Sequence, residues 1–426
     1  MPDTLKDLDV RGLLVQRSHE QEFDEHLVGV SRTVYCGFDP TAPSLHVGNL
    51  VPLMALGRFQ RSGHKPIVLV GGATGLIGDP SGRDDERQLN PAEVVHEWAN
   101  RLQEQTNRFV SFEGSNAALV VNNYDWASST SLIQFLRDVG KHFSVNSLIQ
   151  REAIKSRLGR EGGGISYTEF SYALVQALDF LQLYRDFNCT IQVGGQDQWG
   201  NIVSGIDLIR RVEGGSTYGL TLPLVERSDG KKFGKSTGGA IWLDPNLTSP
   251  YAFYQFWLNV DDSDVRPFLN YFTYDDVDTI NAIADAHEAE PSRRDGQRYL
   301  ASQITELVHG VSGLRSAERI TNALFGGDTD SLNAVDLAQL ELDGVTSTQV
   351  HENDSLLYGL VALGLVPSKG RARQLVQQGG ITLNGRKVND VDELLVRSNA
   401  LFGKYHLLRR GKKSWALLVH VDDSSK

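Results

Sequence analysis

The stretch TVYCGFDPTAPSLHVGNL, residues 33–50, reads as a buried strand that passes through a polar turn into a helix. Its first six residues are mostly apolar, and Asp39 with the proline after it ends the run. We expect Ser44 to cap the helix, with His46 and Asn49 in its first turns. Free backbone N–H groups and the dipole at a helix start favour anions, so this turn is a candidate phosphate site.

The same alternation of strand and helix continues along the first half of the chain. Further strands are predicted at 66–71, 118–122 and 190–194, and helices at 45–60, 91–110 and 168–184. Strands that alternate with helices indicate a Rossmann-like α/β fold, with a parallel sheet covered on both faces. Ligands bind beyond the carboxyl ends of such strands, and the segments there are rich in Gly, Asn and Asp. We therefore expect these segments to converge on one pocket.

The remainder of the chain changes character, which predicts three further parts. After a catalytic domain at 1–244 we expect a helical domain at 245–340, an acidic linker at 341–354 and a small α+β domain at 355–426. In the last of these, Ser368 suits the cap of a short helix with Ala372, Leu375 and Val376 facing inward. The pair Asn384-Gly385 between apolar alternation predicts a hairpin.

Composition narrows the class of protein. The chain of 426 residues is 40% hydrophobic and 22% charged, which is typical of soluble globular proteins, and its start lacks the apolar core of a signal peptide. We expect a cytoplasmic protein without a membrane segment. Only Cys36 and Cys189 occur, in no zinc-site spacing, so no protein-bound metal is predicted. The net charge is −11, yet residues 366–414 hold eleven Lys and Arg against three acids, which favours RNA binding there.

Two further segments carry candidate chemistry. In DGKKFGKST, residues 229–237, the lysines suit a mobile basic loop that neutralises phosphate charge, although a solvated surface loop is the common explanation of such a run. In SYTEFSYALVQALDF, residues 166–180, the spacing puts Tyr172, Gln176 and Asp179 on one helical face. A polar stripe of this kind either faces water or forms part of a buried site.

Taken together, HVGN at 46–49 and KFGKS at 232–236 resemble the HIGH and KMSKS signatures of class I aminoacyl-tRNA synthetases. Both depart from the consensus, but Asn49 still suits a hydrogen bond to the ATP ribose. The segments YCGFDPTAPSLH, GGATGLIGDPSG, TEFSYALVQALDF and GGQDQWGNI resemble the bacterial tyrosyl branch in order and spacing. Other HxGH-type nucleotidyltransferases and the tryptophanyl branch remain as alternatives, as does an RNA-binding factor on an inactive synthetase scaffold.

The resemblance implies a role for each matching residue. Catalytic residues would be Thr41, His46, Asn49, Lys232 and Lys235, and the tyrosine contacts would be Tyr35, Asp79, Tyr172, Gln176, Asp179 and Gln198. ATP contacts would be Cys36, Gly37, Asp39, Gly48, Gly195, Asp197, Arg83, Arg87 and Lys235. Tyr35 and Asp179 would meet the substrate phenol, and Mg²⁺ would arrive on the ATP phosphates.

The C-terminal part resembles an S4-type RNA-binding domain. The resemblance implies tRNA contacts at Lys369, Arg371, Arg373, Arg386 and Lys387. It also implies that L-tyrosine, ATP and tRNA(Tyr) are the partners, and that the protein is a homodimer. The expected reaction is the ATP-dependent attachment of tyrosine to tRNA through tyrosyl-adenylate.

Overall fold

The computed structural model describes residues 3–79, 90–151, 154–155, 158, 165–226, 228, 233–236, 239–327, 329–411 and 414–421, with no side chains for 235 and 236. Contacts within the chain define two compact units. Unit 1 comprises 1–241 and 261–296, and unit 2 comprises 242–260 and 297–426. The domain boundaries expected from the sequence divide the chain differently and stay predictions.

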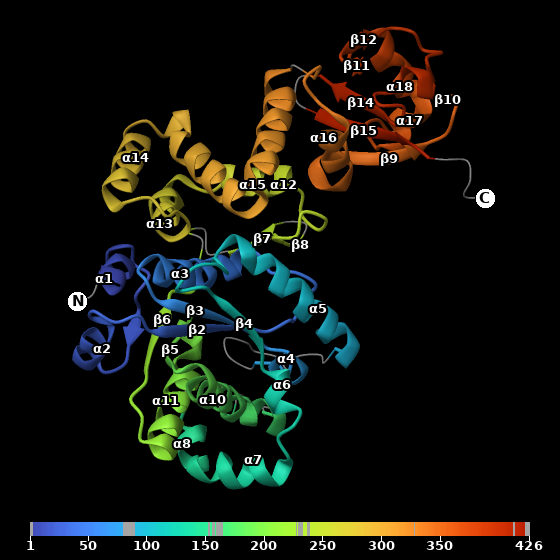
Figure 1. Cartoon of the computed structure of the whole chain (residues 1–426). Helices are drawn as coiled ribbons and strands as arrows, with labels where there is room; N and C mark the ends of the chain where they lie inside the picture. The colour runs from blue at the N-terminus through green and yellow to red at the C-terminus, as the bar shows by residue number, and fades with distance from the viewer. Residues whose placement is uncertain are drawn as a thin grey trace. The chain divides into compact units, whose positions relative to one another are not determined.

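Unit 1 is built on a six-stranded sheet (Figure 1). Its strands, in spatial order, are β1 (Gln16–Arg17), β6 (Tyr218–Leu222), β5 (Cys189–Gly195), β2 (Thr33–Phe38), β3 (Lys65–Val70) and β4 (Leu119–Asn122). All neighbouring pairs are parallel except β1 with β6. The predicted parallel sheet is confirmed, because β2, β3, β4 and β5 overlap the four predicted strands.

Helices cover both faces of this sheet, with α3 and α5 on one side and α10 and α11 on the other (Figure 1). The helices of unit 1 are α1 (Asp3–Val10), α2 (Glu20–Leu27), α3 (Leu50–Arg61), α4 (Thr74–Ile77), α5 (Ala92–Gln105), α6 (Tyr124–Ala127), α7 (Leu132–Asp138), α8 (Val145–Ile149), α10 (Tyr167–Phe187), α11 (Trp199–Glu213), α13 (Asp262–Phe272) and α14 (Val277–Ala289). Tyr35, Ile67 and Leu69 from the sheet pack against Phe180 of α10 and Ile202 of α11. Burial on both faces explains why these strands are almost continuously apolar.

Two strands of the sheet, β6 and β1, were not predicted from the sequence. Strand β6 has the sequence YGLTL, and all five of its residues are buried. A glycine and a threonine interrupt its apolar run, so its pattern is weaker than that of its neighbours. Strand β1 has two residues, which is too short to show a period.

Helix α3, which follows the HVGN segment, is fixed at its far end by a buried arginine. Arg58 is 5% exposed and donates to Asp7 Oδ2 at 3.1 Å and to the Thr273 carbonyl at 2.5 Å. Burial lowers the pKa of Arg58 to about 10, so the side chain stays charged at neutral pH. The contacts of Arg58 with Asp7 and Thr273 connect α3 to α1 and to the segment after α13. Loss of Asp7 would leave the buried charge of Arg58 without its ion-pair partner, which is costly.

Unit 2 consists of helices followed by a small module with its own sheet. Its helices are α12 (Pro250–Leu258), α15 (Asp295–Gly326, whose first two residues belong to unit 1), α16 (Ala334–Gln339), α17 (Leu356–Ala362) and α18 (Lys369–Gln377). Its five-stranded sheet has the order β12 (Arg386–Val388), β11 (Ile381–Leu383), β14 (Tyr405–Arg410), β15 (Ser414–His420) and β9 (Thr346–Val350). Strands β10 (Asp354–Ser355) and β13 (Leu394–Leu395) pair separately, and Gly310 interrupts α15 with a φ of 72°.

The helix cap and the hairpin predicted for the last module are confirmed, while Leu375, expected to face inward, is only partly buried. Ser368 caps α18 by accepting from the backbone N–H of Arg371, and Ala372 and Val376 are fully buried. Asn384 and Gly385 have φ values of 47° and 83°, as a tight hairpin turn requires, and they join β11 to β12. The stretch 341–354, expected to be a linker, instead contributes β9, which pairs in parallel with β15.

The module shares a hydrophobic core with the helices of its unit. Tyr251 from α12 and Ile320 from α15 pack in one cluster with Tyr405, Leu407 and Leu417 of the sheet. Within the described part of the chain, none of the helices combines the length and the apolar composition that a membrane span needs.

Candidate functional site

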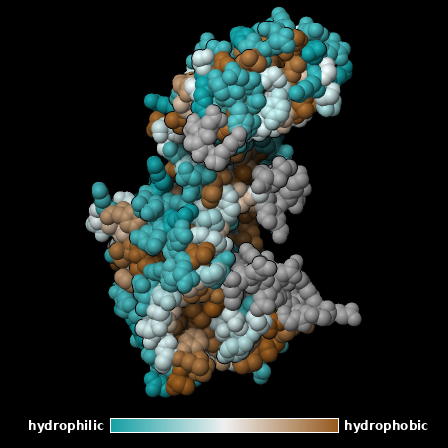
Figure 2. Space-filling view, turned by 90° about the vertical axis from the view of Figure 1, so that its right-hand side faces the viewer, coloured by the Kyte–Doolittle hydropathy of each residue, from teal (hydrophilic) through white to brown (hydrophobic). Residues whose placement is uncertain are grey.

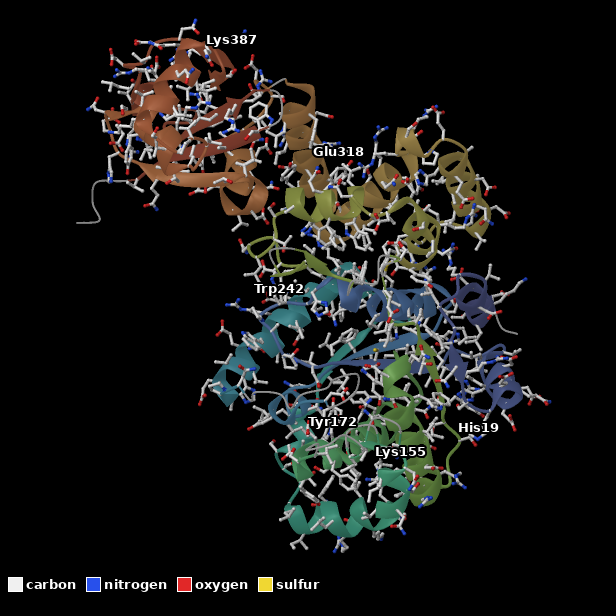
Figure 3. All side chains as sticks on the ribbon, turned by 180° about the vertical axis from the view of Figure 1, so that it is seen from behind. His19, Lys155, Tyr172, Trp242, Glu318 and Lys387 are labelled. Carbon is white, nitrogen blue, oxygen red and sulfur yellow. The ribbon has the colours of Figure 1, made fainter. Side chains whose placement is uncertain are left out.

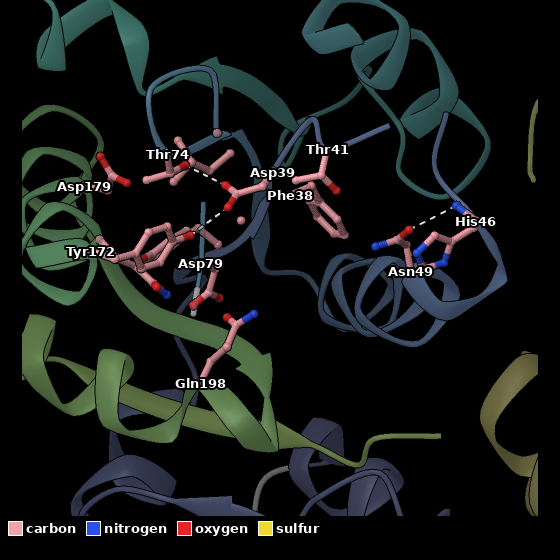
Figure 4. Close-up of a pocket in the computed structure, with 15 residues that line it drawn as sticks. Phe38, Asp39, Thr41, His46, Asn49, Thr74, Asp79, Tyr172, Asp179 and Gln198 are labelled. Atoms are coloured by element: carbon pink, nitrogen blue, oxygen red, sulfur yellow. Dashed lines mark hydrogen bonds between the residues drawn. The ribbon is translucent and has the colours of Figure 1, made fainter. Parts of the chain in front are cut away.

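A polar cavity of about 200 Å³ opens in unit 1 where β2 and β3 end (Figure 4). It is lined by Tyr35, Gly37, Phe38, Asp39, Thr41, His46, Asn49, Leu69, Gly71, Thr74, Asp79, Tyr172, Gln176, Asp179 and Gln198. Most of these residues are among the predicted site residues. They meet because the carboxyl ends of parallel strands lie along one edge of the sheet.

The innermost group is a buried carboxylate. Asp179 on α10 is 1% exposed and accepts hydrogen bonds from Asn123 Nδ2 at 3.0 Å and from Trp126 Nε1 at 2.8 Å. Burial raises the pKa of Asp179 to about 7, although the two donors oppose the shift. The sequence left open whether the stripe of Tyr172, Gln176 and Asp179 faces water, and the structure shows that it lines the cavity.

Tyr35 brings a second polar group to the same end of the cavity. Its side chain is 1% exposed, its ring packs against Phe180, and its hydroxyl has no partner among the described residues. Burial, followed by the nearby charge of Asp179, raises the pKa of Tyr35 well above its usual range. A buried hydroxyl without a partner is costly, so this position is suited to a ligand that supplies one.

A chain of hydrogen bonds connects Asp179 to Asp39. Asn123 donates to Thr74 Oγ1 at 3.0 Å, Thr74 donates to Asp39 Oδ1 at 2.6 Å, and the hydroxyl of Tyr172 donates to Asp39 Oδ2 at 2.8 Å. Figure 4 shows Asp39 between Thr74 and Tyr172. The expected ATP contact Asp39 is therefore bonded to two residues at the Asp179 end of the cavity.

Further amide and carboxylate groups line the cavity. Gln176 accepts from Asn201 Nδ2 at 2.9 Å, which turns its own NH₂ group away from Asn201. Asp79 and Gln198 also line the cavity. Burial, together with the charge of Asp79, raises the pKa of Asp197. The two acids are thus close enough to interact, and this part of the cavity favours a cationic or hydrogen-donating group.

A second hollow of about 270 Å³ adjoins the first and shares Gly37, Phe38, Asn49 and Gln198 with it. The predicted ATP residues Cys36, Gly48, Gly195 and Asp197 line this second hollow. Burial raises the pKa of the Cys36 thiol to about 12, so it remains a neutral group at physiological pH.

The turn at HVGN differs from the prediction. His46, not Ser44, caps the helical segment, because its Nδ1 accepts from the Gly48 N–H at 3.0 Å while Asn49 Oδ1 accepts from the His46 N–H. Ser44 instead donates to Leu45 O and to Gln105 Oε1. The segment begins as a 3-10 turn, Val47–Asn49, that leads into α3. The imidazole lies so close to Gly48 that a Cβ there would be 2.8 Å from the ring.

The described part of KFGKS lies directly on HVGN. A Cβ at Gly234, where φ is 78°, would be 2.8 Å from Val47 Cγ2, which explains the glycine. The backbone N–H of Ile241 donates to Gly234 O, and that of Val47 donates to Ile241 O. Phe233 stacks on Phe272 of α13 with ring centroids 5.5 Å apart. These contacts bring together two segments that lie far apart in the sequence.

Four predicted residues cannot be placed in full. Arg83, Arg87 and Lys232 lie outside the described residues, and only the backbone of Lys235 is described. Within the described ranges, no group of three or more His, Cys, Asp and Glu is gathered as a metal ion would require.

The structure adds residues that the sequence did not single out. Asn123 and Trp126 hold Asp179, Thr74 holds Asp39, and Asn201 holds Gln176. The available signal for the first two was the segment NNYDW, which follows strand β4 and was expected to reach the pocket. Its individual members had no periodicity that marked them.

Comparisons with known proteins define the family. The family model described as tRNA synthetases class I (W and Y) matches residues 30–326, and that of the tyrosine--tRNA ligase SYY-like C-terminal domain matches residues 336–418. The fold is thus that of a class I aminoacyl-tRNA synthetase. The tyrosine--tRNA ligase of Aliivibrio fischeri is 53% identical over 419 residues, which is 98% of each chain. This chain belongs to the tyrosine--tRNA ligase family.

Other matches agree with this assignment. The tyrosine--tRNA ligase of Escherichia coli is 49% identical over 415 residues, covering 97% of this chain and 98% of the relative. A truncated mitochondrial tyrosyl-tRNA synthetase from Aspergillus nidulans superposes with a TM-score of 0.69 at 29% identity, covering 76% of this chain and 95% of that one. The tyrosyl branch is therefore favoured over the tryptophanyl and nucleotidyltransferase alternatives.

Removing the hydroxyl from each of the two buried tyrosines at the site should affect the stability of the protein differently. Tyr35→Phe removes a hydroxyl without a protein partner and should leave the free energy of unfolding unchanged or raise it by up to about 1 kcal/mol. Tyr172→Phe removes a bond to the Asp39 carboxylate and should lower it by about 1–3 kcal/mol. Urea unfolding of the unliganded protein measures both. An equal loss in the two variants would contradict the assignment of the Tyr35 hydroxyl.

Proposed function

We propose that this chain attaches L-tyrosine to tRNA(Tyr) in two steps, with tyrosyl-adenylate as the intermediate. The family match over nearly the whole chain supports the reaction, and the paired Tyr35 and Asp179 carry the substrate assignment. The phenol O–H of tyrosine donates to Asp179, and its oxygen accepts from Tyr35. Phenylalanine would bring no hydroxyl and would leave both buried groups short of a partner, which opposes its binding.

The ammonium and carboxylate groups of the amino acid meet the remaining polar residues of the cavity. Asp79, Tyr172 and Gln176 hold the ammonium group, and Gln198 contacts the carboxylate. The hydrogen bond from Tyr172 to Asp39 uses the phenol proton of Tyr172, so its oxygen can act only as an acceptor toward the ammonium group. A cation is favoured here because Asp39 and Asp79 contribute negative charge.

ATP occupies the adjoining hollow. The ribose contacts Cys36, Asp197 and Asn49. The nucleotide also contacts a second group of residues, in which the glycines let it approach the backbone closely: Gly37, Asp39, Gly48 and Gly195. Thr41 and His46 contact the γ-phosphate, and Lys232, Lys235, Arg83 and Arg87 neutralise the pyrophosphate. Mg²⁺ arrives bound to the phosphates. The contact of Gly234 with Val47 supports a shared task for the two signature segments.

The chemistry needs positioning more than proton transfer. In the first step the tyrosine carboxylate oxygen attacks the α-phosphorus, the bond from that phosphorus to the bridging oxygen breaks, and pyrophosphate leaves. In the second step a terminal ribose hydroxyl of the tRNA attacks the tyrosyl carbonyl, the bond from that carbon to the phosphate oxygen of AMP breaks, and the hydroxyl proton passes to the departing phosphate or to water as AMP leaves. A carboxylate is already a nucleophile at neutral pH, so the barrier falls through orientation and stabilisation of charge.

The C-terminal module is proposed to bind the tRNA. Lys369, Arg371, Arg373, Arg386 and Lys387 are all exposed, on α18 and on the hairpin of β11 and β12. Lys387 is labelled on this module in Figure 3. The surplus of basic residues at 366–414 suits phosphate contacts in a chain whose net charge is −11. The cytoplasm is the proposed compartment, where tRNA is charged.

Amino-acid-dependent exchange of pyrophosphate into ATP tests the function. Among the standard amino acids, tyrosine alone should support exchange, because it alone satisfies Tyr35 and Asp179. Lys235→Ala should reduce the exchange rate much more than the affinity for tyrosine, since the lysine acts on the phosphates. Exchange with tryptophan, or with another carboxylic acid in place of tyrosine, would overturn the substrate assignment.

The pKa of Asp179 predicts a pH dependence. The ionised carboxylate accepts the phenol O–H, and the free enzyme protonates this group below a pKa of about 7. The kcat/KM for tyrosine should therefore fall about tenfold per pH unit below that value. In the profile of kcat the inflection should move to lower pH, because bound tyrosine donates to the carboxylate and stabilises its charge. A kcat/KM that stays level down to pH 5 would contradict this role.

A homodimer is also proposed, with α7 at its interface. Leu132, Ile133 and Leu136 on α7 are 70%, 72% and 44% exposed, and Val145 at the start of α8 is 58% exposed. Figure 2 shows hydrophobic residues gathered at the lower end of the molecule, where Figure 1 places these helices. An apolar patch of this kind is typical of an interface between subunits.

Sedimentation velocity tests the interface. The wild type should sediment as a dimer, and the double substitution Leu132→Asp and Ile133→Asp should shift it to a monomer, because charges placed in an apolar contact lose their water. Val335→Asp is the control, since Val335 is an exposed apolar residue, 66% exposed, on α16 of unit 2 and is not part of this apolar patch. A monomeric wild type, or a double variant that stays dimeric, would refute this interface.

A further inference from the structure

A hollow in unit 2 has no part in the function described so far. It has a volume of about 590 Å³ and lies where the C-terminal end of α15 meets β9 and β15. Its lining includes Leu324, Phe325, Val345 and Trp415. Pockets that hold small organic groups are of this size, and they combine apolar walls with a few polar atoms.

Two aromatic side chains of the hollow are presented in different ways. Phe325, the penultimate residue of α15, is 75% exposed. Trp415 is partly buried, and its Nε1 donates to the carbonyl of Leu324 at 2.9 Å, which fixes the indole edge. The guanidinium of Arg409 lies 5.2 Å from the centre of the same indole. The indole of Trp415 is therefore held in place by the fold, and the neighbouring ring of Phe325 is exposed to solvent.

The charges around the hollow favour a polyanion. Arg409 is the cross-strand neighbour of Trp415 and lies on the same face of the sheet, whereas Arg410, the neighbour of Ser414, lies on the other face and donates to the carbonyl of Leu365. These arginines belong to the stretch 366–414, in which basic residues far outnumber acids. Aromatic rings next to arginines are the combination that proteins use to bind single-stranded nucleic acid.

We propose that this hollow holds one unpaired nucleobase of the tRNA, stacked on Phe325, with Trp415 as the fixed wall and Arg409 near the adjoining phosphate. The inference rests on tRNA being the substrate, and it adds a base contact to the phosphate contacts of the module. Folded RNA offers splayed bases only in loops, bulges and ends, so the site engages a single-stranded part of the tRNA. Stacking accepts any base, because each one has a π face.

The first experiment measures the affinity of the full-length protein for a tRNA(Tyr) transcript by fluorescence anisotropy at several salt concentrations. Phe325→Ala should raise Kd about tenfold, whereas Phe325→Tyr, which keeps the ring, should stay within about twofold. Phe402→Ala is the matched control, since Phe402 is another exposed phenylalanine of unit 2 and does not line the hollow. Pyrophosphate exchange should be unchanged in all three variants, which shows that each is folded.

Salt dependence separates stacking from phosphate contact. Phe325→Ala should leave the slope of log Kd against log salt unchanged, whereas Arg371→Ala should reduce the slope by about one. If Arg371→Ala and Lys387→Ala weaken binding while Phe325→Ala does not, the stacking proposal fails and the RNA-binding role of the module stands. If none of the three variants changes Kd, the RNA-binding role itself is refuted, and the stacking proposal with it.

The second experiment identifies the base. A series of transcripts, each lacking one base at a single-stranded position, is titrated with the wild type and with Phe325→Ala. One abasic transcript should bind the wild type about tenfold more weakly than the intact transcript does. The Phe325→Ala variant should bind that abasic transcript and the intact transcript equally well. Additive losses at every position would overturn the proposal. Competition by free AMP at millimolar concentration, with the same loss in Phe325→Ala, would assign the hollow to a free nucleotide and also overturn it.

Discussion

A carboxylate that is 1% exposed is stable only with hydrogen-bond donors around it, and the interior of unit 1 is arranged to meet that demand at Asp179. Helix α10 carries the carboxylate below the sheet, and the segment after β4 supplies Asn123 and Trp126 as donors. Asn123 extends the network to Thr74, and Thr74 extends it to Asp39. One buried charge thus fixes how three loops at the edge of the sheet are placed.

Among the described residues that line the cavity, one buried polar group has no partner, and that group defines the ligand. The hydroxyl of Tyr35 lies near Asp179, yet it has no partner among the described residues. A site that satisfies every buried group has no preference for a polar ligand, whereas this one gains hydrogen bonds when a phenol enters. Tyrosine specificity is thus proposed to come from what the protein leaves unpaired.

Periodic and local patterns in the sequence predicted much of the structure, and contacts between distant segments account for the rest. The strands at 33–38 and 190–194, the cap at Ser368 and the turn at Asn384-Gly385 each depend on neighbours within a few residues, and all are confirmed. By contrast, the capping of the turn Val47–Asn49 by His46 and the hydrogen bond from Asn123 to Asp179 depend on side-chain geometry that hydrophobic periodicity does not reveal. Strand β9 was taken for a linker because TSTQV is a polar edge strand, with its residues mostly exposed.

The core that unit 2 shares has a consequence for synthesis of the chain. Helix α12 leaves the ribosome long before β14 and β15, yet Tyr251 is buried against Leu407 and Leu417 of those strands. Until translation is almost complete, the apolar face of α12 remains exposed to solvent, where chaperones can bind it or other chains can aggregate with it. A premature stop near the C-terminus would therefore do more than remove an RNA contact. It would also leave α12, encoded more than a hundred codons earlier, without the strands that bury it.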